Sequence, residues 1–333
     1  LSFALRHLHA KAGINVTASH NPSIYNGYKA YWEDGAQISP EQADVVSAAI
    51  EKVDIFTGVK LVSFEEGKKA GLIQIIGQEV DEAYMKVVLA ERIRPNAIPD
   101  VADDFKVVYT PFHGTGRILV PEVLKRAGRF PTVKSPNPED KAGFALAMKI
   151  AEENGCDLLI GTDPDADRAG VIVRASNGEF VPLTGNQIGV MLLSYIIEAR
   201  KLENKLPANA AAVKSIVSTK LADKICEANG VTMINVLTGF KFIGEKIKEF
   251  EETGSHTYIF GFEESYGYLS GTYARDKDAV CAAMLITEMA AFYRARGKSL
   301  YEVLCGIFDK YGYYSEGIGT IVLPGLDGLA KMS

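Results

Sequence analysis

The stretch GCDLLIGTDPDADR, residues 155–168, predicts both the fold of the chain and its chemistry. An apolar run at 158–160 ends in a loop where Asp163, Asp165 and Asp167 alternate with other residues. Five more polar loops follow short apolar or β-branched runs: TASHNP (17–22), PFHGTG (111–116), STK (218–220), TGFK (238–241) and FEESYG (262–267). In parallel α/β sheets, ligand-binding loops lie beyond the carboxyl ends of the strands. We therefore expect the six loops to meet at one cleft.

The alternation of apolar runs with amphipathic stretches is typical of α/β layers rather than of sandwiches or bundles. Helices are expected at residues 1–13, 79–95, 118–128, 143–155, 185–202, 238–250 and 279–295. Strands are expected at 14–16, 106–110, 158–160, 171–175, 211–217, 231–236 and 257–260, and one more within 313–328.

Two polar stretches, NAIPDVADD (96–104) and ENKLPANA (203–210), indicate domain boundaries. We expect three domains, at 1–95, 104–203 and 208–311, followed by the stub of a fourth at 312–333. The chain begins without an initiator methionine, inside an apolar helical pattern. This opening predicts a fragment that starts within its first domain.

Composition excludes several classes of protein. With 36 basic and 42 acidic residues the net charge is −6, so the chain has no basic field for nucleic acid or an anionic membrane. No apolar run approaches the roughly 20 residues that cross a bilayer, and no signal peptide is visible. The four cysteines are dispersed, which predicts reduced thiols in a cytoplasmic protein.

The alternating aspartates indicate a metal site. Three carboxylates at one strand end repel one another unless a cation lies between them, and hard oxygen ligands favour Mg²⁺. An EF-hand loop would need Gly and Glu where the chain has Arg168 and Arg174. A phosphatase that uses one of these aspartates as nucleophile stays open. Arg168 could hold a phosphate oxygen or a carboxylate.

The TASHNP loop offers a nucleophile. A serine hydroxyl near Mg²⁺ can carry a phosphoryl group, because the metal offsets the charge on the transferring oxygens. Ser19 is therefore a candidate carrier. His20 and Lys29, in the same loop region, are candidates for proton carrier or phosphate clamp.

Two further loops are candidate sugar-binding elements. In GFEESYGY, Glu263 and Ser265 offer an acceptor and a donor for vicinal hydroxyls. In LTGFKFIG, Gly239 permits a turn and Lys241 could reach a hydroxyl or a phosphate. The segment RDKD (275–278) could add charge at the rim.

Taken together, TASHNP, GTDPDADR, TGFKFIG and GFEESYG resemble the α-D-phosphohexomutase superfamily over nearly the whole chain. The fuller NPSIYNGYKAYWEDGAQ is similar to its phosphoglucomutase/phosphopentomutase branch. The resemblance implies consecutive mixed-sheet α/β/α sandwich domains with the active site in the cleft between them. It also implies that His113 and Arg168 are secondary members of the site.

The resemblance further implies the chemistry. Ser19 would be the phosphorylated residue, Asp163, Asp165 and Asp167 would hold Mg²⁺ with it, and Glu263 and Ser265 would bind sugar. Phosphoserine would give its group to a sugar monophosphate, and the resulting bisphosphate, such as glucose 1,6-bisphosphate, would reorient and return its other phosphate. General acid/base work would fall to His20, Lys29 or Lys241.

Three functions follow as hypotheses. The first is a phosphoglucomutase that interconverts glucose 1-phosphate and glucose 6-phosphate, with phosphopentomutase and phosphomannomutase as variants. The second is the Mg²⁺-dependent sugar phosphatase, and the third is a sugar-phosphate sensor without catalysis. The family's other parts, an early Thr-Ser-Gly/Arg motif and a fourth domain that grips the distal phosphate, are absent from these residues. We therefore expect this stretch alone to bind Mg²⁺ and to turn over poorly.

Overall fold

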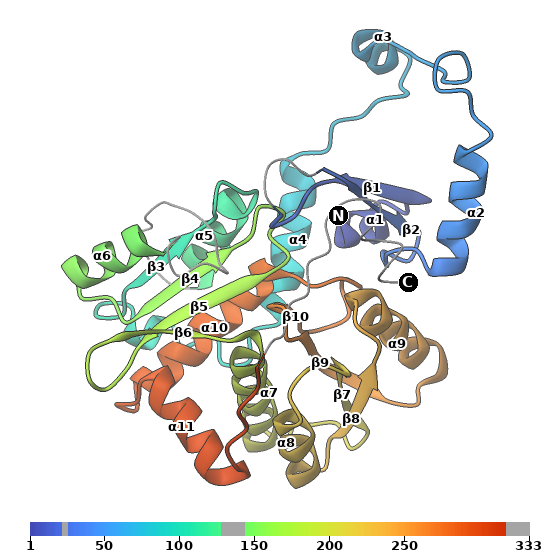
Figure 1. Cartoon of the computed structure of the whole chain (residues 1–333). Coiled ribbons are helices and arrows are strands. Elements are labelled where there is room, and N and C mark those ends of the chain that lie inside the picture. Colours follow the sequence, from blue (N-terminus) through green and yellow to red (C-terminus); the bar gives the residue numbers. More distant parts are fainter. Residues whose placement is uncertain (22–25, 128–143, 318–333) are drawn as a thin grey trace.

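The computed structural model describes residues 1–21, 26–127 and 144–317. It confirms an α/β protein with mixed sheets (Figure 1). Most of the expected fourth-domain stub, and the strand expected within 313–328, lie outside the described residues. Within the described part, residues 312–317 form no helix or strand.

The first mixed sheet contains the acidic stretch. Its order is β3-β4-β5-β6, with β3 parallel to β4 and the other pairs antiparallel. The strands are β3 Val107–Thr110, β4 Leu158–Thr162, β5 Ala169–Arg174 and β6 Phe180–Leu183. Strand periodicity sends Val108 and Leu159 to the face that α6 (Ala145–Asn154) covers. Val107 and Leu158 face the opposite side, where α5 (Gly116–Ala127) packs.

The second mixed sheet has the order β10-β9-β7-β8, in which β7 is parallel to both β8 and β9. Its strands are β7 Ala210–Ser215, β8 Thr232–Val236, β9 Thr257–Glu263 and β10 Gly267–Leu269. On one face, the apolar side chains of α9 (Phe240–Thr253) pack against Val213 and Tyr258. On the other face lie α7 (Gly185–Leu202) and α8 (Leu221–Asn229).

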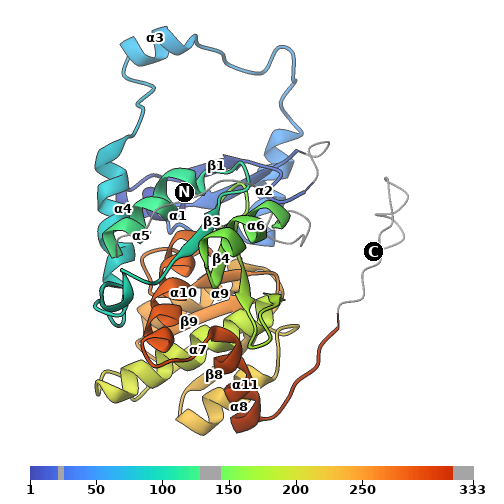
Figure 2. The same cartoon turned by 90° about the vertical axis from the view of Figure 1, so that its left-hand side faces the viewer.

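Helix α10 (Ala279–Arg294) joins the two sheets into one core. Every residue from Ala279 to Ala291 is buried, as expected of a helix that is apolar all round. Its side chains belong to the same apolar cluster as β4, β5, β9 and α11 (Leu300–Tyr311). Both views place α10 at the centre of the molecule (Figures 1 and 2).

The N-terminal part corrects one prediction. The helix expected over 1–13 is shorter, α1 (Ser2–His7). The strand expected at 14–16 is confirmed and begins earlier, as β1 (Ala12–Val16), antiparallel to β2 (Tyr28–Trp32). The ladder with β2 takes the backbone groups that a longer helix would have used. Gly13 lets the strand lie against Leu5, whose methyl carbon would be 2.8 Å from an added Cβ.

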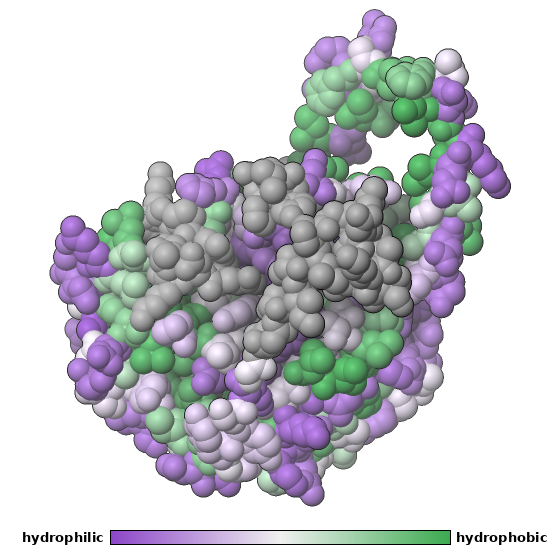
Figure 3. Space-filling view, in the orientation of Figure 1, coloured by the Kyte–Doolittle hydropathy of each residue, from purple (hydrophilic) through white to green (hydrophobic). Residues whose placement is uncertain are grey.

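Between β2 and the first sheet the chain forms α2 (Pro40–Ile50), α3 (Phe64–Lys69), α4 (Gln78–Ala90) and a short 3-10 turn, Pro99–Val101. The segment around α3 projects from the body in both ribbon views (Figures 1 and 2). It exposes apolar side chains, including Phe56 at 88% and Leu61 at 90%, and Figure 3 shows hydrophobic colour along it.

A glycine substitution tests how closely α7 approaches the turn between β9 and β10. At Gly185, in the first turn of α7, a Cβ would lie 2.0 Å from the Glu264 carbonyl oxygen, which cannot yield easily. We expect Gly185→Ala to lower the free energy of unfolding by about 2 to 3 kcal/mol through this overpacking. Gly306→Ala, in open space on α11, should instead raise it by roughly 1 kcal/mol through helix propensity. Urea unfolding midpoints measure both, and equal shifts would contradict the close approach.

Candidate active site

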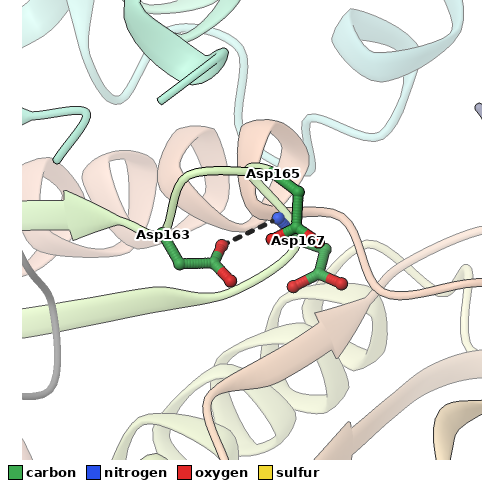
Figure 4. Close-up of side chains that lie close together, drawn as sticks. All are labelled: Asp163, Asp165 and Asp167. Atoms are coloured by element: carbon green, nitrogen blue, oxygen red, sulfur yellow. Dashed lines mark hydrogen bonds between the residues drawn. The ribbon is translucent and has the colours of Figure 1, made fainter. Parts of the chain in front are cut away.

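The three aspartates form one cluster at the hairpin between β4 and β5 (Figure 4). One carboxylate oxygen from each lies within 4.8 Å of the others. Asp163 is fully buried, and its Oδ1 accepts hydrogen bonds from the backbone N–H groups of Asp167 at 3.1 Å and Arg168 at 3.0 Å. These two hydrogen bonds close the turn after β4 and leave Asp163 Oδ2 available to other partners.

Ser19 lies against this cluster, although 144 residues separate it from Asp163. Its Oγ is 3.2 Å from Asp163 Oδ2 and 3.2 Å from Asp165 Oδ1. Thr17 fixes the loop, because its Oγ1 accepts the Ser19 N–H at 2.8 Å. His20 is adjacent, with Nδ1 at 3.4 Å from the serine oxygen.

Two lysines approach the cluster from different elements. Lys29 Nζ lies 2.9 Å from Asp165 Oδ2 and 2.9 Å from Asp167 Oδ2. The structure corrects its placement, since Lys29 belongs to strand β2 and not to the serine loop. Lys277, from the segment before α10, also lies 2.9 Å from Asp167 Oδ2 and is 8% exposed.

The oxygens that the lysines leave free fit a divalent cation. Asp167 Oδ1 is buried and has no hydrogen-bond partner, which is costly for a carboxylate without a ligand. One carboxylate oxygen from each aspartate lies within 4.8 Å of the others, and Ser19 Oγ is 3.2 Å from Asp163 Oδ2 and from Asp165 Oδ1, so the four residues offer a set of hard oxygen donors. Mg²⁺ prefers such donors and retains positions for water or phosphate oxygens.

The electrostatics of the cluster also favour a bound cation. Burial, followed by repulsion from Asp167 and Asp165, raises the pKa of Asp163 to about 8. Burial also acts to raise the pKa of Asp165, but its hydrogen bond with Asp163 and the Lys29 ammonium lower it overall. Without a cation, Lys29 and Lys277 offset two of the three carboxylate charges, and burial favours the protonated form of Asp163.

Cation binding should therefore expel a proton. At pH 7 we expect Mg²⁺ to release about one proton per site, since the metal ligand must be deprotonated. Without the cation, stability should fall as pH rises from the usual 3.8 through the raised pKa, because the folded state then holds the extra proton. Titration calorimetry in buffers of different ionisation enthalpy measures the release. Heats that do not depend on the buffer would contradict it.

The six predicted loops form one connected set. Thr115, in the PFHGTG loop, donates its N–H to the Pro164 carbonyl at 2.9 Å, and Ala169 N–H donates to Tyr266 in the FEESYG loop at 3.1 Å. Glu263 Oε1 accepts the N–H of Gly239 at 2.7 Å, which attaches the TGFK loop. The STK loop joins through the Ser218 hydroxyl, which accepts the Glu264 N–H at 3.1 Å.

The loops share a second property, backbone strain. Among the described non-glycine residues with positive φ, five of seven lie in these loops: Ser19, Phe112, His113, Ala166 and Tyr266. Such conformations persist only where the surroundings enforce them, and they concentrate at functional sites. The strain supports the interpretation of the loops as one site.

The remaining predicted site residues differ in their exposure and contacts. His113 is exposed on its loop, and Ser265 is half-buried in the turn between β9 and β10. Lys241 lies in the first turn of α9 with its ammonium 5.0 Å from the Phe242 ring. Among the contacts of the described residues, none joins Lys241 to the three aspartates. Arg168 Nε is 3.9 Å from Asp167 Oδ1.

Sequence reasoning gave too little weight to Lys277. RDKD was expected to add charge at a rim, whereas the side chain of its lysine is only 8% exposed and contacts Asp167. Thr17 and Tyr31 were also missed. The period-2 pattern of β2 is the signal that could have found Tyr31, because it shares a strand face with Lys29.

These features define a class of protein, an α/β/α protein with a carboxylate loop suited to a divalent cation. The chain belongs to the phosphoglucomutase/phosphomannomutase family. The family's models of α/β/α domains I, II and III match residues 1–55, 82–178 and 184–311, in chain order. The resemblance to the α-D-phosphohexomutase superfamily is thereby confirmed.

Curated relatives of the chain belong to the same family. The chain is similar to the phosphoglucomutase of Staphylococcus aureus strain MRSA252, at 37% identity over 349 aligned residues. The alignment covers 100% of this chain and 60% of the relative, so the chain spans about three fifths of its length. The phosphoglucomutase of strain USA300 is 36% identical, with 61% of it covered.

Solved structures share the fold. A Thermus thermophilus protein, provisionally named a phosphomannomutase, has a TM-score of 0.71 at 24% identity, covering 94% of this chain and 66% of that one. N-acetylphosphoglucosamine mutase of Aspergillus fumigatus has a TM-score of 0.58 at 14% identity, covering 92% and 75%. Among the described helices, none combines the length and apolar character needed to span a bilayer.

Proposed function

We propose that the protein is a phosphoglucomutase-type enzyme that moves a phosphoryl group between two hydroxyls of one sugar through Ser19. One observation carries the proposal: the Ser19 hydroxyl lies 3.2 Å from carboxylate oxygens of both Asp163 and Asp165. A serine placed among metal-type ligands can exchange a phosphoryl group, because charge on the transferring oxygens is offset there.

Asp163, Asp165, Asp167 and Ser19 would hold Mg²⁺. When bound, the ion supplies the positive charge that the transferring phosphoryl oxygens need. The A. fumigatus mutase was solved with GlcNAc-6P and magnesium, and in another structure with glucose 1,6-bisphosphate. By analogy, we propose Mg²⁺ as the metal and a sugar bisphosphate as the activator.

In the transfer step, a sugar hydroxyl oxygen forms a bond to the phosphorus on Ser19, and the bond from phosphorus to Ser19 Oγ breaks. The hydroxyl proton moves to a base and from there to the departing serine oxygen, which becomes a hydroxyl again. His20 is the proposed base, with Nδ1 at 3.4 Å from Ser19 Oγ. Lys29 is not: although burial acts to lower its pKa, Asp167 beside it raises the pKa overall, so it stays an ammonium. The bisphosphate then turns and returns its other phosphate to Ser19.

Substrate binding is assigned to the loops of the second sheet. Glu263 and Ser265 are proposed to bind sugar hydroxyls, and Gly239 lets the TGFK loop reach Glu263. Lys241, Arg168 and His113 are proposed to contact the phosphates. We propose glucose phosphates as the substrates, because the curated relatives at 36–37% identity are named phosphoglucomutases. The domain bounds and the cytoplasmic location stay predictions.

Label mapping tests the proposal. The intact protein is incubated with Mg²⁺ and glucose 1,6-bisphosphate labelled in both phosphates, and the label is then located by peptide mapping. We expect the label on Ser19 and isomerisation of glucose 1-phosphate. An acyl phosphate on Asp163 or Asp165 would favour the phosphatase. Binding of the bisphosphate without any transfer would favour the sensor.

A further inference from the structure

The segment RDKD (275–278), between β10 and α10, is a junction of several elements. Arg275 pairs with Glu251 on α9, and Lys277 contacts Asp167 in the acidic hairpin. Asp278 caps α10 by accepting N–H groups of that helix. These three residues thus contact three different parts of the fold. The remaining residue of the segment, Asp276, contacts the N-terminal sheet.

Asp276 has both carboxylate oxygens engaged. Its Oδ2 accepts hydrogen bonds from the Tyr31 hydroxyl at 2.8 Å and from Gln37 Nε2 at 2.9 Å. Its Oδ1 accepts the Lys277 N–H at 2.9 Å and lies 3.4 Å from Lys277 Nζ. Tyr31 and Asp276 are 5% and 6% exposed, so water does not substitute for these partners. The carboxylate cannot rotate without losing bonds on both sides.

Strand β2 connects this junction to the acidic cluster a second time. Lys29 and Tyr31 alternate with Tyr28 and Trp32, which are exposed, so the lysine and the tyrosine share the inward face. Lys29 contacts Asp167 directly, while Tyr31 reaches it through Asp276 and Lys277. Both ammonium groups lie 2.9 Å from the same oxygen, Asp167 Oδ2.

We propose that Tyr31 and Gln37 are positioning residues, which hold Lys277 against Asp167 through Asp276. The inference rests on the proposed function, because the held ammonium sets the charge beside the metal ligands. A lysine side chain has many rotamers, and buried hydrogen bonds that fix its neighbour restrict them. The contacts also require β2 to be seated on the RDKD segment, so the site is complete only when the N-terminal sheet is docked.

Kinetics of the intact protein test the proposal. Tyr31→Phe removes only the hydroxyl, and we expect kcat to fall about tenfold with KM changed less than about twofold, because Lys277 is misplaced while sugar contacts remain. Tyr84→Phe is the matched control. Its hydroxyl donates to Asp278 at 2.7 Å, one residue beyond Lys277, and burial raises its pKa as it does that of Tyr31. The control should lose stability and keep kcat.

A double-mutant comparison separates positioning from general damage. In a Lys277→Met background, Tyr31→Phe should lower kcat no further, because the group that it positions is gone. If Tyr31→Phe costs the same factor with and without Lys277, or if Tyr84→Phe lowers kcat equally, the proposal is wrong. Urea unfolding confirms that each variant is folded.

A second readout needs no turnover. Acetylation of Lys277 by acetic anhydride is compared by mass spectrometry with Lys11, whose side chain is 89% exposed. We expect Tyr31→Phe and Gln37→Leu to speed Lys277 labelling about fivefold through local opening, and Tyr84→Phe to leave it unchanged. Unchanged labelling in the first two variants would overturn the proposal. A wild-type protein without mutase turnover would count against the proposed function instead, and this readout would still decide the positioning role.

Discussion

Ser19→Ala should abolish phosphoryl transfer while the protein still binds Mg²⁺ and sugar bisphosphate. The variant lacks the one protein atom that the proposed mechanism phosphorylates, so we expect kcat of the intact protein for glucose 1-phosphate to fall by about 10⁴-fold or more. The three aspartates keep their own contacts, because the Asp163 turn is closed by backbone N–H groups. The measurement is a coupled assay of glucose 6-phosphate formation, together with calorimetric binding of the bisphosphate.

Ser39→Ala serves as the control for the serine substitution. Ser39 caps α2 by accepting the Gln42 N–H, and its loss should cost about 1 kcal/mol of stability and leave kcat unchanged. Turnover by Ser19→Ala within tenfold of wild type would exclude Ser19 as the carrier. If neither the wild type nor Ser19→Ala isomerises glucose 1-phosphate, while both still bind the bisphosphate, the protein is a sensor.

Asp165→Asn should remove Mg²⁺ binding and turnover together. Asp165 offers Oδ1 beside Ser19 and Oδ2 to Lys29, so an amide there loses a ligand charge and leaves Lys29 with one partner fewer. We expect the affinity for Mg²⁺ to fall by about 100-fold or more and kcat/KM by about 10³-fold at a fixed low Mg²⁺ concentration. Calorimetric titration and assays across Mg²⁺ concentrations measure the two effects.

The other end of β4 supplies a matched control. Asp157 immediately precedes the strand and pairs with Arg174 at 3.2 Å and with Arg294 at 2.7 Å. Asp157→Asn removes one carboxylate charge at the opposite end of β4 and should leave the Mg²⁺ affinity unchanged. An equal loss of affinity in both variants would show that overall charge, and not ligation, governs binding.

Predictions from the sequence were most accurate for elements whose local residue pattern alone indicates their structure or chemistry. Helix α7 has the bounds expected for 185–202, because a Thr184 cap starts it and its apolar spacing is regular. The acidic hairpin was expected because alternating aspartates after an apolar run indicate a metal site, and Ser19 was assigned to it through the resemblance to a known superfamily. The helix expected over 1–13 ends at His7, because pairing with β2, a tertiary contact, extends the expected strand back to Ala12.

What the sequence could not predict is which polar residues meet across long separations. In the sequence, Lys241 and Lys277 are both lysines in polar segments that were expected to lie near the site. Of these two, Lys277 contacts Asp167, whereas Lys241 lies over the Phe242 ring. That difference depends on how β10 and α10 seat the RDKD segment, which is tertiary packing. Strands β2 and β6 were not predicted either, since short or half-exposed strands give weak periodicity. Helix α11 was also not predicted, although Leu300, Val303, Leu304 and Ile307 have helical spacing and Ser299 caps the helix.

The distance along the chain between Ser19 and its acidic partners has a consequence for synthesis. The serine leaves the ribosome 144 residues before Asp163, and Lys277 follows later still. Contacts of such long range form late, after local helices and hairpins. In a nascent chain, Ser19 is therefore synthesised before the aspartates beside which it acts. During refolding, enzymatic activity should return after the helical circular dichroism signal has recovered.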